Sequence, residues 1–404
     1  MLNLSTNLIK NFILHMKNIK KFVIVGSGKQ GISVAYDLLR NSNHHVVMVD
    51  MYEDFLNQAL KKISTIINSD NLTGILADVT DSDKILEILS DADVMISAVP
   101  YEFNLNLTKL AIKSKTSMVD LGGHTNIVRE QLSMNQQAQS AGVTIVPDCG
   151  MGPGMNITMA VLATEILDKT DEIYICDGGL PKNPKPPWNY SLFFNIEGLT
   201  NEYDEQAYFL KEGKIVEVPC FENIENVTFD NIGELEAAVT SGGLSTMPWT
   251  FKNKLKVLEN KTLRYKGHWE WMKAFRELGL FSRKSVDHNG NKIVPRHFYH
   301  QLLENKLDHG RVEDICLMRI KAIGIKDSKK VELNIDAVEY YNKELDLTAM
   351  EKWTGWHISI MALEIAYNKI NKGALSVENA LKGQTFLEEA KNRGYDITIN
   401  IREI

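Results

Sequence analysis

The chain has 404 residues, 44% hydrophobic and 24% charged, which is typical of a globular protein large enough for two or three domains. Its net charge of −7 argues against a nucleic-acid partner or an anionic membrane surface. Four widely spaced cysteines without a C-x-x-C pair indicate neither a metal site nor a disulfide framework, and they fit a reducing cytoplasm. No apolar run approaches the roughly 18 residues of a spanning helix, so no membrane partner is expected.

The first nineteen residues are rich in Asn, Lys and Leu and carry no core typical of a secretory signal. Two interpretations stay open. Either the natural chain starts at Met16, just before the first strand, or the segment forms an N-terminal helix that frays.

Up to residue 150, short apolar runs alternate with stretches of helical periodicity. This alternation predicts an α/β fold with a doubly wound parallel sheet, in which ligands collect at the carboxyl ends of the strands. The predicted strands are 21–25, 46–49, 74–77, 94–99, 117–121 and 143–147, and the predicted helices are 31–40, 54–67, 81–89, 104–114 and 127–141.

The first strand leads into a turn with the spacing Gly26-x-Gly28-x-x-Gly31. In a Rossmann dinucleotide-binding domain these glycines permit the turn, let the backbone approach the pyrophosphate, and let helix and strand pack closely. Asp50 ends the next strand 19 positions after Gly31, near the spacing of about 20 for the acidic residue that binds the ribose hydroxyls. A carboxylate there repels a 2′-phosphate, which favours NAD over NADP; the alternative is a glycine-rich turn that binds nothing. The predicted cofactor-binding residues here are Gly26, Ser27, Gly28, Lys29, Gln30, Gly31 and Asp50.

Further chemistry-bearing residues stand at the later strand exits. Asp78 follows the third strand, where side chains reach the adenine, but it is also a candidate N-cap of the next helix. The fifth and sixth strands are followed by Asp120 and Asp148. The exits of the third and fourth strands add these predicted cofactor-binding residues: Asp78, Val79, Ala98, Val99 and Pro100.

Beyond Gly154 the pattern changes to a helix over 156–168, a strand over 172–176 and a segment rich in Gly and Pro, Gly178–Pro187, expected to be a rigid irregular loop. Strand-like patches bounded by Gly, Asn and Lys then indicate a second, α+β domain with a mixed or antiparallel sheet. These patches are 191–194, 214–218, 260–264, 313–322, 329–337 and 342–348.

A helix over 353–371, ending at Gly373, is expected to return to the first domain. The predicted organisation is therefore a Rossmann NAD-binding domain over 1–125, a substrate domain over 126–350 and a C-terminal helical segment over 351–404. Residues 126–150 either belong to the second domain or complete the first sheet.

Two segments at strand exits, Val119-Asp-Leu-Gly-Gly-His124 and Val146-Pro-Asp-Cys-Gly-Met-Gly-Pro-Gly-Met155, make the chain similar to the saccharopine dehydrogenase-like family. Within that family the chain most resembles the L-lysine 6-dehydrogenases, from about residue 20 to about residue 375. It departs from them at Pro248-Trp249 and in the aromatic stretch Trp269–Trp271, both of which are candidates for lining the substrate pocket. Three further stretches carry the resemblance: Asn195-Ile-Glu-Gly-Leu199, Thr240-Ser-Gly-Gly-Leu-Ser-Thr246 and Lys261-Thr-Leu-Arg-Tyr-Lys-Gly-His268.

The resemblance implies an NAD-dependent oxidoreductase that oxidises the terminal amine of L-lysine to a semialdehyde, which then cyclises to piperideine-6-carboxylate. Because a protonated amine cannot release hydride and the ε-amine has a pKa of about 10.4, the site must desolvate the amine or supply a base. The candidate bases are Asp148, His124 and Asp120. Each has a structural alternative: Asp148 as a turn residue, His124 as a structural histidine and Asp120 as a partner of loop amides.

Arg264 is the candidate for binding the substrate α-carboxylate, because its planar fork matches that group in a bidentate way. The alternative is a surface arginine at a strand end. Hydroxyls and amides of the segment Thr240, Ser241 and Gly242 are suited to the same carboxylate, or they form an ordinary tight turn. The resemblance adds Tyr265 and Tyr190 to the substrate-binding candidates. Trp269 and Met272 share a helix face and are expected in the core.

Two other functions stay open. A saccharopine dehydrogenase or reductase acting on a related amino acid would need a second carboxylate clamp. A non-catalytic NAD-binding sensor would keep the fold without turnover. The expected partners are a small amino-acid substrate and a second copy of the chain, since aromatic patches in the second domain allow a homodimer through its sheet.

Overall fold

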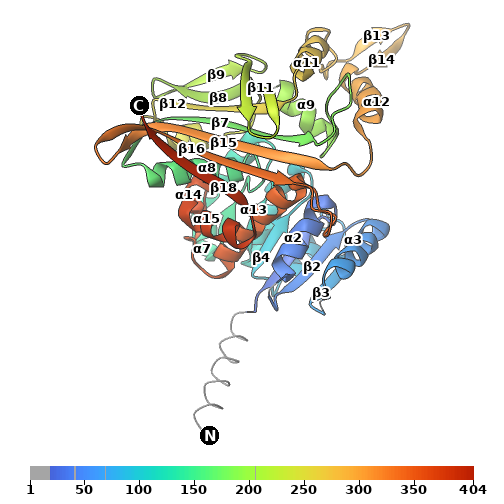
Figure 1. Ribbon diagram of the computed structural model, residues 1–404. Helices are drawn as coiled ribbons and strands as arrows, with labels where there is room; N and C mark the ends of the chain where they lie inside the picture. Colours follow the sequence, from blue (N-terminus) through green and yellow to red (C-terminus); the bar gives the residue numbers. More distant parts are fainter. Residues whose placement is uncertain (1–18, 41, 69, 205) are drawn as a thin grey trace. The chain divides into compact units, whose positions relative to one another are not determined.

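The computed structural model describes residues 19–40, 42–68, 70–204 and 206–404 (Figure 1). Met16 and the N-terminal segment before it lie outside the described residues. The chain divides into two compact units. Unit 1 contains the described residues up to Gly122, then Asn126–Cys149 and Thr354–Leu375, and unit 2 contains Gly123–Thr125, Gly150–Trp353 and Ser376–Ile404.

Unit 1 contains a seven-stranded sheet in the order β17-β6-β5-β4-β1-β2-β3, with parallel pairing throughout the described strands. The predicted doubly wound α/β domain is confirmed. Its interior strand β1 forms because Phe22–Val25 is a run of apolar residues buried from both faces. The elements are β1 (Lys21–Val25), α2 (Lys29–Leu39), β2 (His45–Asp50), α3 (Glu53–Ile66), β3 (Leu72–Leu76), α4 (Ser82–Leu89), β4 (Val94–Ser97), the 3-10 helix Tyr101–Phe103, α5 (Asn104–Ser114), β5 (Ser117–Asp120), α6 (Thr125–Ser133), α7 (Asn135–Ala141), β6 (Thr144–Val146) and β17 (Gly373–Ala374).

Two details of unit 1 differ from the prediction. The helix expected over 127–141 is divided into α6 and α7, with Met134 as the residue between them. The two-residue strand β17 was missed, because Gly373–Ala374 is too short to show any periodicity.

Unit 2 contains a nine-stranded mixed sheet with the path β10-β11-β12-β7-β15-β16-β18, to which β8 and β9 are added beside β12. Strands β12 and β7 are parallel and the other described pairs of this sheet are antiparallel. The predicted second α+β domain is therefore confirmed. The elements are α8 (Met155–Ile166), β7 (Lys169–Pro181), α9 (Ile196–Asp204), β8 (Gln206–Lys211), β9 (Lys214–Pro219), β10 (Glu225–Phe229), β11 (Gly233–Val239), α10 (Met247–Thr250), β12 (Val257–Arg264), α11 (His268–Glu277), β13 (Val286–His288), β14 (Asn291–Ile293), α12 (Pro295–Leu307), β15 (Asp314–Lys326), β16 (Lys329–Tyr340), α13 (Ala349–Ala366), α14 (Val377–Ala380), α15 (Gly383–Asn392) and β18 (Asp396–Glu403).

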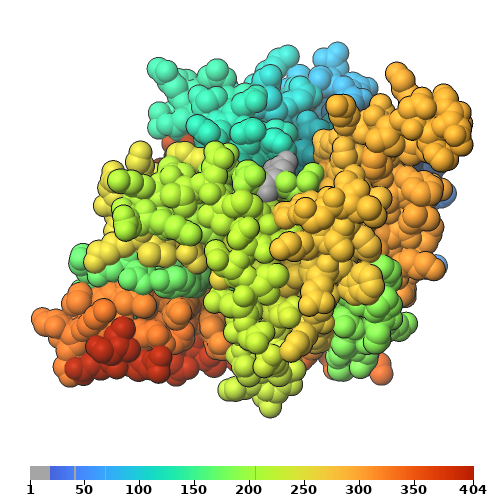
Figure 2. All heavy atoms as spheres, turned by 90° about the horizontal axis from the view of Figure 1, so that it is seen from above, coloured from blue at the N-terminus to red at the C-terminus, as the bar shows by residue number. Residues whose placement is uncertain are grey.

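Helix α12 lies against α9, which brings two distant parts of unit 2 together at its surface. Arg296 donates hydrogen bonds to Glu197 (3.0 Å) and to Asn201 (2.8 Å). Figure 2 shows the amber and orange atoms of residues around 265–310 beside the lime-green atoms of residues around 200–230.

The glycine- and proline-rich segment Gly178–Pro187 is only partly irregular, so the prediction was wrong for its first four residues. Strand β7 continues through Pro181, with Gly178 paired to Leu317 of β15. A side chain at Gly178 would meet the carbonyl oxygen of Leu263 at 2.6 Å. The glycine here permits a close approach between strands, and it does not break the strand.

Two predicted strands and the predicted C-terminal segment also need correction. Residues 191–194 form no strand, and 342–348 form a turn closed by a bridge between Asn342 and Leu347. The helix expected over 353–371 is α13, which ends at Ala366, and residues 351–404 do not form one helical segment. Their last part belongs to unit 2, because Ile397, Ile399 and Ile401 alternate with polar residues and form strand β18.

Candidate functional site

The glycine turn of unit 1 has the geometry that the sequence predicts for a dinucleotide site. Gly26 has φ +103°, and a side chain there would meet the carbonyl oxygen of Ala98 at 2.7 Å. A side chain at Gly31 would lie 2.0 Å from the carbonyl oxygen of Gly26, so helix α2 lies directly against the end of β1. Gly28 differs from both, because a side chain there would meet no protein atom within 4 Å.

The start of helix α2 offers backbone donors for an anion. Its N-cap is Gly28, and no side chain caps this end of the helix. The first amides of a helix have no partner within the helix, and the helix dipole favours negative charge beside them. The open backbone at Gly28 and the uncapped helix together fit a dinucleotide pyrophosphate.

Asp50 is held beside the glycine turn, as the spacing predicts. Its carboxylate accepts hydrogen bonds from the Ser27 amide (2.8 Å), the Ser27 hydroxyl (2.7 Å) and the Tyr52 amide (3.0 Å). Glu53 and Asp54 follow in the first turn of α3. This end of β2 is therefore acidic, which suits ribose hydroxyls and disfavours a 2′-phosphate.

The residues that follow β4 adjoin the glycine turn, whereas Asp78, which follows β3, bonds within its own loop. Ala98 and Val99 contact the space beside Gly26, so they adjoin the predicted dinucleotide site. Asp78 accepts hydrogen bonds from the amide and the hydroxyl of Thr80, both at 2.8 Å, and these bonds lower the pKa of Asp78. The N-cap of α4 is Asp81, so the alternative that made Asp78 this cap is wrong. The predicted contacts of Asp78, Val79 and Pro100 with a bound cofactor stay predictions.

Asp120 and Asp148 are neighbours in unit 1, and both are buried. The carboxylate of Asp120 accepts from the Gly122 amide (2.8 Å), the Gln131 side chain (2.7 Å) and the Asp148 amide (3.3 Å). Burial raises the pKa of Asp120 to about 6. These contacts correspond to the loop-organising alternative for Asp120.

Asp148 and His124 are placed by the turn that contains Gly122. Asp148 has φ +62°, and its carboxylate occupies the space where a side chain of Gly122 would lie. His124 is half-buried and groups with unit 2. A catalytic role for either residue stays a prediction.

One face of strand β12 in unit 2 carries three buried polar side chains. Asn260, Thr262 and Arg264 alternate along it and are 1%, 8% and 3% exposed. Leu263 points the other way, into an apolar cluster with Leu180 and Leu235. Burying polar groups is costly unless they have partners, so the polar face is a candidate functional surface.

Arg264 is the centre of this polar face, and the alternative of a surface arginine is wrong. Its guanidinium donates to the Tyr203 hydroxyl (3.0 Å) and to the Leu263 carbonyl (2.9 Å). The third nitrogen, Nη2, lies 3.7 Å from the Glu202 carboxylate, longer than a charge-assisted hydrogen bond. The guanidinium also lies 4.7 Å from the ring centre of Tyr190. The ion pair with Glu202 at this edge of the fork is therefore longer than the two hydrogen bonds on its other nitrogens.

Two carboxylates adjoin Arg264. Glu202 is 31% exposed at its side chain, and desolvation raises its pKa to about 7 against the opposing effect of Arg264. Asp177 on β7 is buried and accepts from the Asn260 side chain at 3.4 Å, and burial raises its pKa to about 6. Both groups can therefore exchange a proton near neutral pH.

The predicted Thr240–Gly242 segment lies against the polar face of β12. Thr240 and Thr262 share a hydrogen bond of 2.6 Å between their hydroxyls, and the Ser241 hydroxyl donates to the Asn201 carbonyl at 2.9 Å. The segment is also a turn, in which the Ser245 amide donates to the Gly242 carbonyl (2.9 Å). Both interpretations of this segment therefore fit the structure.

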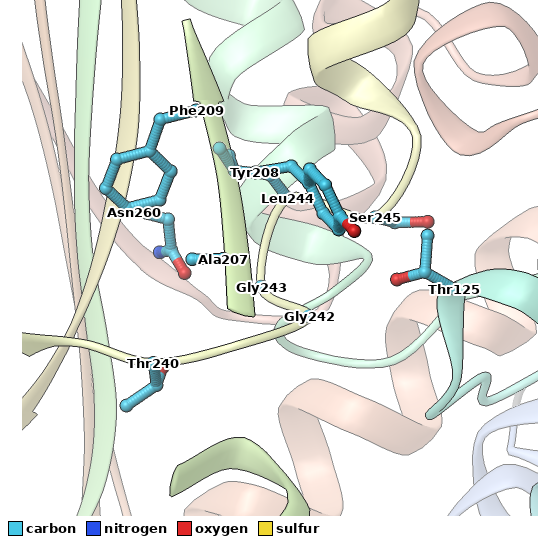
Figure 3. A pocket seen from close by; sticks show the side chains of 10 residues that line it. All are labelled: Thr125, Ala207, Tyr208, Phe209, Thr240, Gly242, Gly243, Leu244, Ser245 and Asn260. Carbon is cyan, nitrogen blue, oxygen red and sulfur yellow. The ribbon is translucent and has the colours of Figure 1, made fainter. Parts of the chain in front are cut away.

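A recess of about 240 Å³, including space open to solvent, adjoins this turn (Figure 3). Figure 3 shows Tyr208 and Thr125 on one side of it and Asn260 on the other. The Asn156 side chain, near the start of α8, donates to the Gly243 carbonyl at 2.9 Å. The first turn of α8 therefore meets the same turn.

The aromatic candidates separate into two groups. Tyr190 is buried against Arg264, as expected of a residue in the site. Tyr265 donates to the Pro181 carbonyl (3.0 Å) and packs on the apolar cluster, so the structure does not bring it together with Arg264. The alternation along β12 explains this, since adjacent strand residues face opposite sides. Trp269 and Met272 are in the core as predicted, whereas Trp271 is exposed.

Sequence reasoning gave no role to several residues of this site. Asp177, Glu202, Asn260 and His268 were not among the predicted site residues. The His268 ring contacts the Tyr203 hydroxyl at 3.1 Å, and burial lowers its pKa to about 3, so the ring is neutral. A weak signal for Asn260 was present, because Asn260 and Thr262 precede Arg264 with a period of two on the same face of the strand.

Two family models match the chain almost end to end. The model described as the saccharopine dehydrogenase NADP binding domain matches residues 22–146, and the saccharopine dehydrogenase C-terminal domain matches residues 150–395. Within the described residues, no helix combines the length and apolar character needed to cross a membrane.

The chain is also similar in sequence to two characterised proteins and in structure to one solved protein. The chain is 27% identical over 293 residues to the mitochondrial alpha-aminoadipic semialdehyde synthase of Rattus norvegicus, covering 67% of this chain and 30% of that protein. It is 24% identical over 287 residues to the saccharopine dehydrogenase [NADP(+), L-glutamate-forming] of Saccharomyces cerevisiae, covering 65% of this chain and 58% of the relative. The chain thus spans less than two thirds of either relative. The apo saccharopine dehydrogenase (L-Glu forming) structure from Saccharomyces cerevisiae matches with a TM-score of 0.76 at 18% identity, covering 95% of this chain and 100% of that one, and it shares the fold.

Proposed function

Because the chain belongs to the saccharopine dehydrogenase family, we propose that it is an NAD-dependent oxidoreductase that oxidises the terminal amine of L-lysine. The carbon that carries this amine loses hydride, and the imine is hydrolysed to a semialdehyde that cyclises with its own α-amine. The observation that carries the proposal is the buried Arg264, whose Nη2 lies 3.7 Å from the Glu202 carboxylate and which has the Asp177 carboxylate nearby.

The acidic end of β2 supports NAD as the cofactor. The dinucleotide, when bound, accepts the hydride. Its pyrophosphate would be held by amides at the start of α2, and its ribose by Asp50. Residues 50–54 contain three carboxylates and no Lys or Arg, and a 2′-phosphate needs a cation there. The yeast relative carries NADP(+) in its name, so the preference for NAD is a proposed difference from it.

Arg264 supports an amino acid as the substrate. Its Nη2 atom would bind the α-carboxylate, with the neutral Tyr190 ring beneath the guanidinium. The carboxylates of Glu202 and Asp177 would attract the ammonium groups of lysine. A carboxylate whose pKa is raised to about 7 is suited to taking a proton near pH 7, so Glu202 joins Asp148 and His124 as a candidate base.

A saccharopine-cleaving or saccharopine-forming reaction is the second candidate, favoured by the fold shared with the whole yeast enzyme. Saccharopine carries additional carboxylates, which need further cations. Two other buried cations of unit 2 already have carboxylate partners: Lys261 contacts Glu225 at 2.9 Å, and Arg296 contacts Glu197 at 3.0 Å. Arg264 lies farther from its carboxylate partner, 3.7 Å from Glu202, and this looser pairing favours the smaller substrate.

An assay of NADH formation at 340 nm tests the proposal. The purified chain is incubated with NAD⁺ and, in separate reactions, with L-lysine, saccharopine and a diamine without a carboxylate, and each reaction is repeated with NADP⁺. We expect the highest kcat/KM with lysine and NAD⁺. A higher value with saccharopine would replace the first candidate by the second. Binding of NADH without turnover of any amine would indicate a sensor.

A further inference from the structure

A chain of hydrogen bonds within unit 2 connects the Arg264 guanidinium to a backbone carbonyl through two buried side chains. Nε of Arg264 donates to the Tyr203 hydroxyl at 3.0 Å. That hydroxyl lies 3.1 Å from Nε2 of His268, and Nδ1 of the same ring lies 3.2 Å from the carbonyl oxygen of Trp188. Tyr203 and His268 are both 0% exposed, so solvent does not reach either side chain.

The carbonyl end of this chain determines which nitrogen of the histidine ring carries hydrogen. A carbonyl oxygen only accepts hydrogen bonds, so Nδ1 of His268 is the donor to Trp188. Burial first, and then the charge of Arg264, lower the pKa of His268 to about 3, so the ring is neutral near pH 7. Nε2 therefore has no hydrogen, and it accepts a hydrogen bond from the Tyr203 hydroxyl.

The neutral ring in turn determines the direction of the Tyr203 hydroxyl. Its single hydrogen is donated to His268, so a lone pair of its oxygen faces the N–H at Nε of Arg264. With hydrogen at Nε2 of His268 instead, the hydroxyl would face two donors and its own hydrogen would lose this acceptor. An unsatisfied donor is costly at a buried site. The protonation of His268 thus prepares Tyr203 as the acceptor for Arg264.

The local sequence explains how His268 returns to the side of Arg264. Strand β12 ends at Arg264, and helix α11 begins at His268. Between them Gly267 has φ +88°, a conformation that favours glycine, and the His268 amide donates to the Tyr265 carbonyl at 3.2 Å. This turn reverses the chain within four residues. Arg264 and His268 can therefore both reach Tyr203, which comes from the distant helix α9.

The guanidinium plane is held by two hydrogen bonds and by aromatic rings. Nη1 donates to the Leu263 carbonyl at 2.9 Å, and Nε donates to Tyr203. The guanidinium carbon lies 4.7 Å from the ring centre of Tyr190 and 5.7 Å from that of Trp269. Loss of the Tyr203 hydroxyl would leave a single one of these two hydrogen bonds, so the plane could turn within the rings.

We propose that His268 is a positioning residue for substrate binding, which holds Arg264 through Tyr203 so that Nη2 meets the substrate α-carboxylate. This proposal rests on the proposed function, in which Arg264 binds that carboxylate. It adds that the affinity for the carboxylate depends on an acceptor at the His268 position. His268 acts on Arg264 through the Tyr203 hydroxyl, so the two residues form one unit.

Matched variants of His268 separate the acceptor from the volume of the side chain. In His268→Gln an amide oxygen can still accept from Tyr203, whereas His268→Leu has no acceptor. We expect His268→Leu to raise the KM for lysine about tenfold, with kcat and the KM for a diamine without a carboxylate almost unchanged. His268→Gln should restore most of the affinity. Equal losses for lysine and the diamine would indicate a merely structural role and would overturn the proposal.

A double variant tests whether His268 acts through Tyr203. Tyr203→Phe removes one hydroxyl from the buried site, and it should raise the KM for lysine as much as His268→Leu does. Because the two residues act as one unit, the variant with both changes should have the KM of Tyr203→Phe alone. Independent, multiplied effects would contradict the proposal. Equal circular dichroism spectra check that each variant is folded.

A spectroscopic measurement tests the hydrogen-bond chain without turnover. The chain has ten histidines, and comparison with His268→Gln identifies the His268 ring in nitrogen-15 spectra of the histidine-labelled protein. We expect a neutral ring with hydrogen at Nδ1 at pH 7; hydrogen at Nε2, or a charged ring, would overturn the proposal. Oxidation of lysine with an unaltered KM in His268→Leu would overturn this proposal alone. An unmodified chain that oxidises no lysine would overturn the proposed function, and this proposal with it.

Discussion

The dinucleotide region of unit 1 and the polar face of unit 2 are built in different ways. The first uses backbone: a glycine turn, an uncapped helix and one carboxylate lie within 25 residues of sequence. The second uses side chains from separate strands and helices, including Asp177 of β7, Glu202 of α9 and Arg264 of β12. A single added methyl group should therefore impair the dinucleotide region, whereas removal of a charged side chain should impair the polar face of unit 2.

Among variants of unit 1, Gly31→Ala should cause the largest loss of stability and of NADH binding. Gly28→Ala separates these two effects. The new methyl group of Gly31→Ala would lie 2.0 Å from a backbone oxygen, so helix α2 must move. We expect a loss of about 3 kcal/mol in the free energy of unfolding and a loss of NADH binding.

Gly28→Ala adds the same methyl group where no protein atom lies within 4 Å. It should leave the melting temperature unchanged while it weakens NADH binding, measured by calorimetry. Unchanged NADH affinity in Gly28→Ala would show that no ligand approaches the turn.

Arg264→Met should have the largest effect in unit 2. Loss of charged hydrogen bonds to the α-carboxylate, worth about 1.5–3 kcal/mol, should raise the KM for lysine roughly 10- to 150-fold. The KM for a diamine without a carboxylate should change far less. Equal increases for both substrates would mean that Arg264 only organises its neighbours Tyr203 and Tyr190.

Asp50→Asn should change the choice of cofactor with a smaller effect on the turn. The amide oxygen can still accept hydrogen bonds from Ser27, whereas the charge that repels a 2′-phosphate is gone. We expect the ratio of kcat/KM for NAD⁺ to that for NADP⁺ to fall about tenfold. An unchanged ratio would assign the cofactor preference to another residue.

Glu202→Gln should have the smallest effect on stability, visible as a pH dependence. Desolvation raises the pKa of Glu202 from 4.5 to about 7 in the folded chain, so the protonated form favours folding. Its contribution to stability is therefore complete below pH 4.5 and disappears as the pH rises through about 7. The urea midpoint should decline over this range in the unmodified chain and decline less in Glu202→Gln. The variant should also lose the rise of kcat/KM with pH near 7, and an identical profile would exclude Glu202 as the base.

The same contrast explains how much the sequence could predict. Local spacing identified the Rossmann sheet, Gly26, Gly28, Gly31 and Asp50, because neighbours in sequence form that region. The side-chain partners Tyr203 and Glu202 of Arg264 lie more than 60 residues away in sequence, and no periodicity encodes which strands and helices become adjacent. The predicted strand over 172–176 was shorter than β7 for a related reason. Gly178 permits the close approach of Leu263 on β12, and this neighbour cannot be seen in the sequence around Gly178.

The central claim is that this chain transfers hydride from an amine-bearing carbon of an amino acid to NAD⁺. Its most direct measurement is a single-turnover reaction of the purified chain with NAD⁺ and lysine deuterated at the carbon of the terminal amine. We predict NADH that carries one deuterium, formed in equal amount with the cyclised semialdehyde. Absence of deuterium from the NADH, or absence of NADH with lysine and saccharopine alike, would contradict the claim.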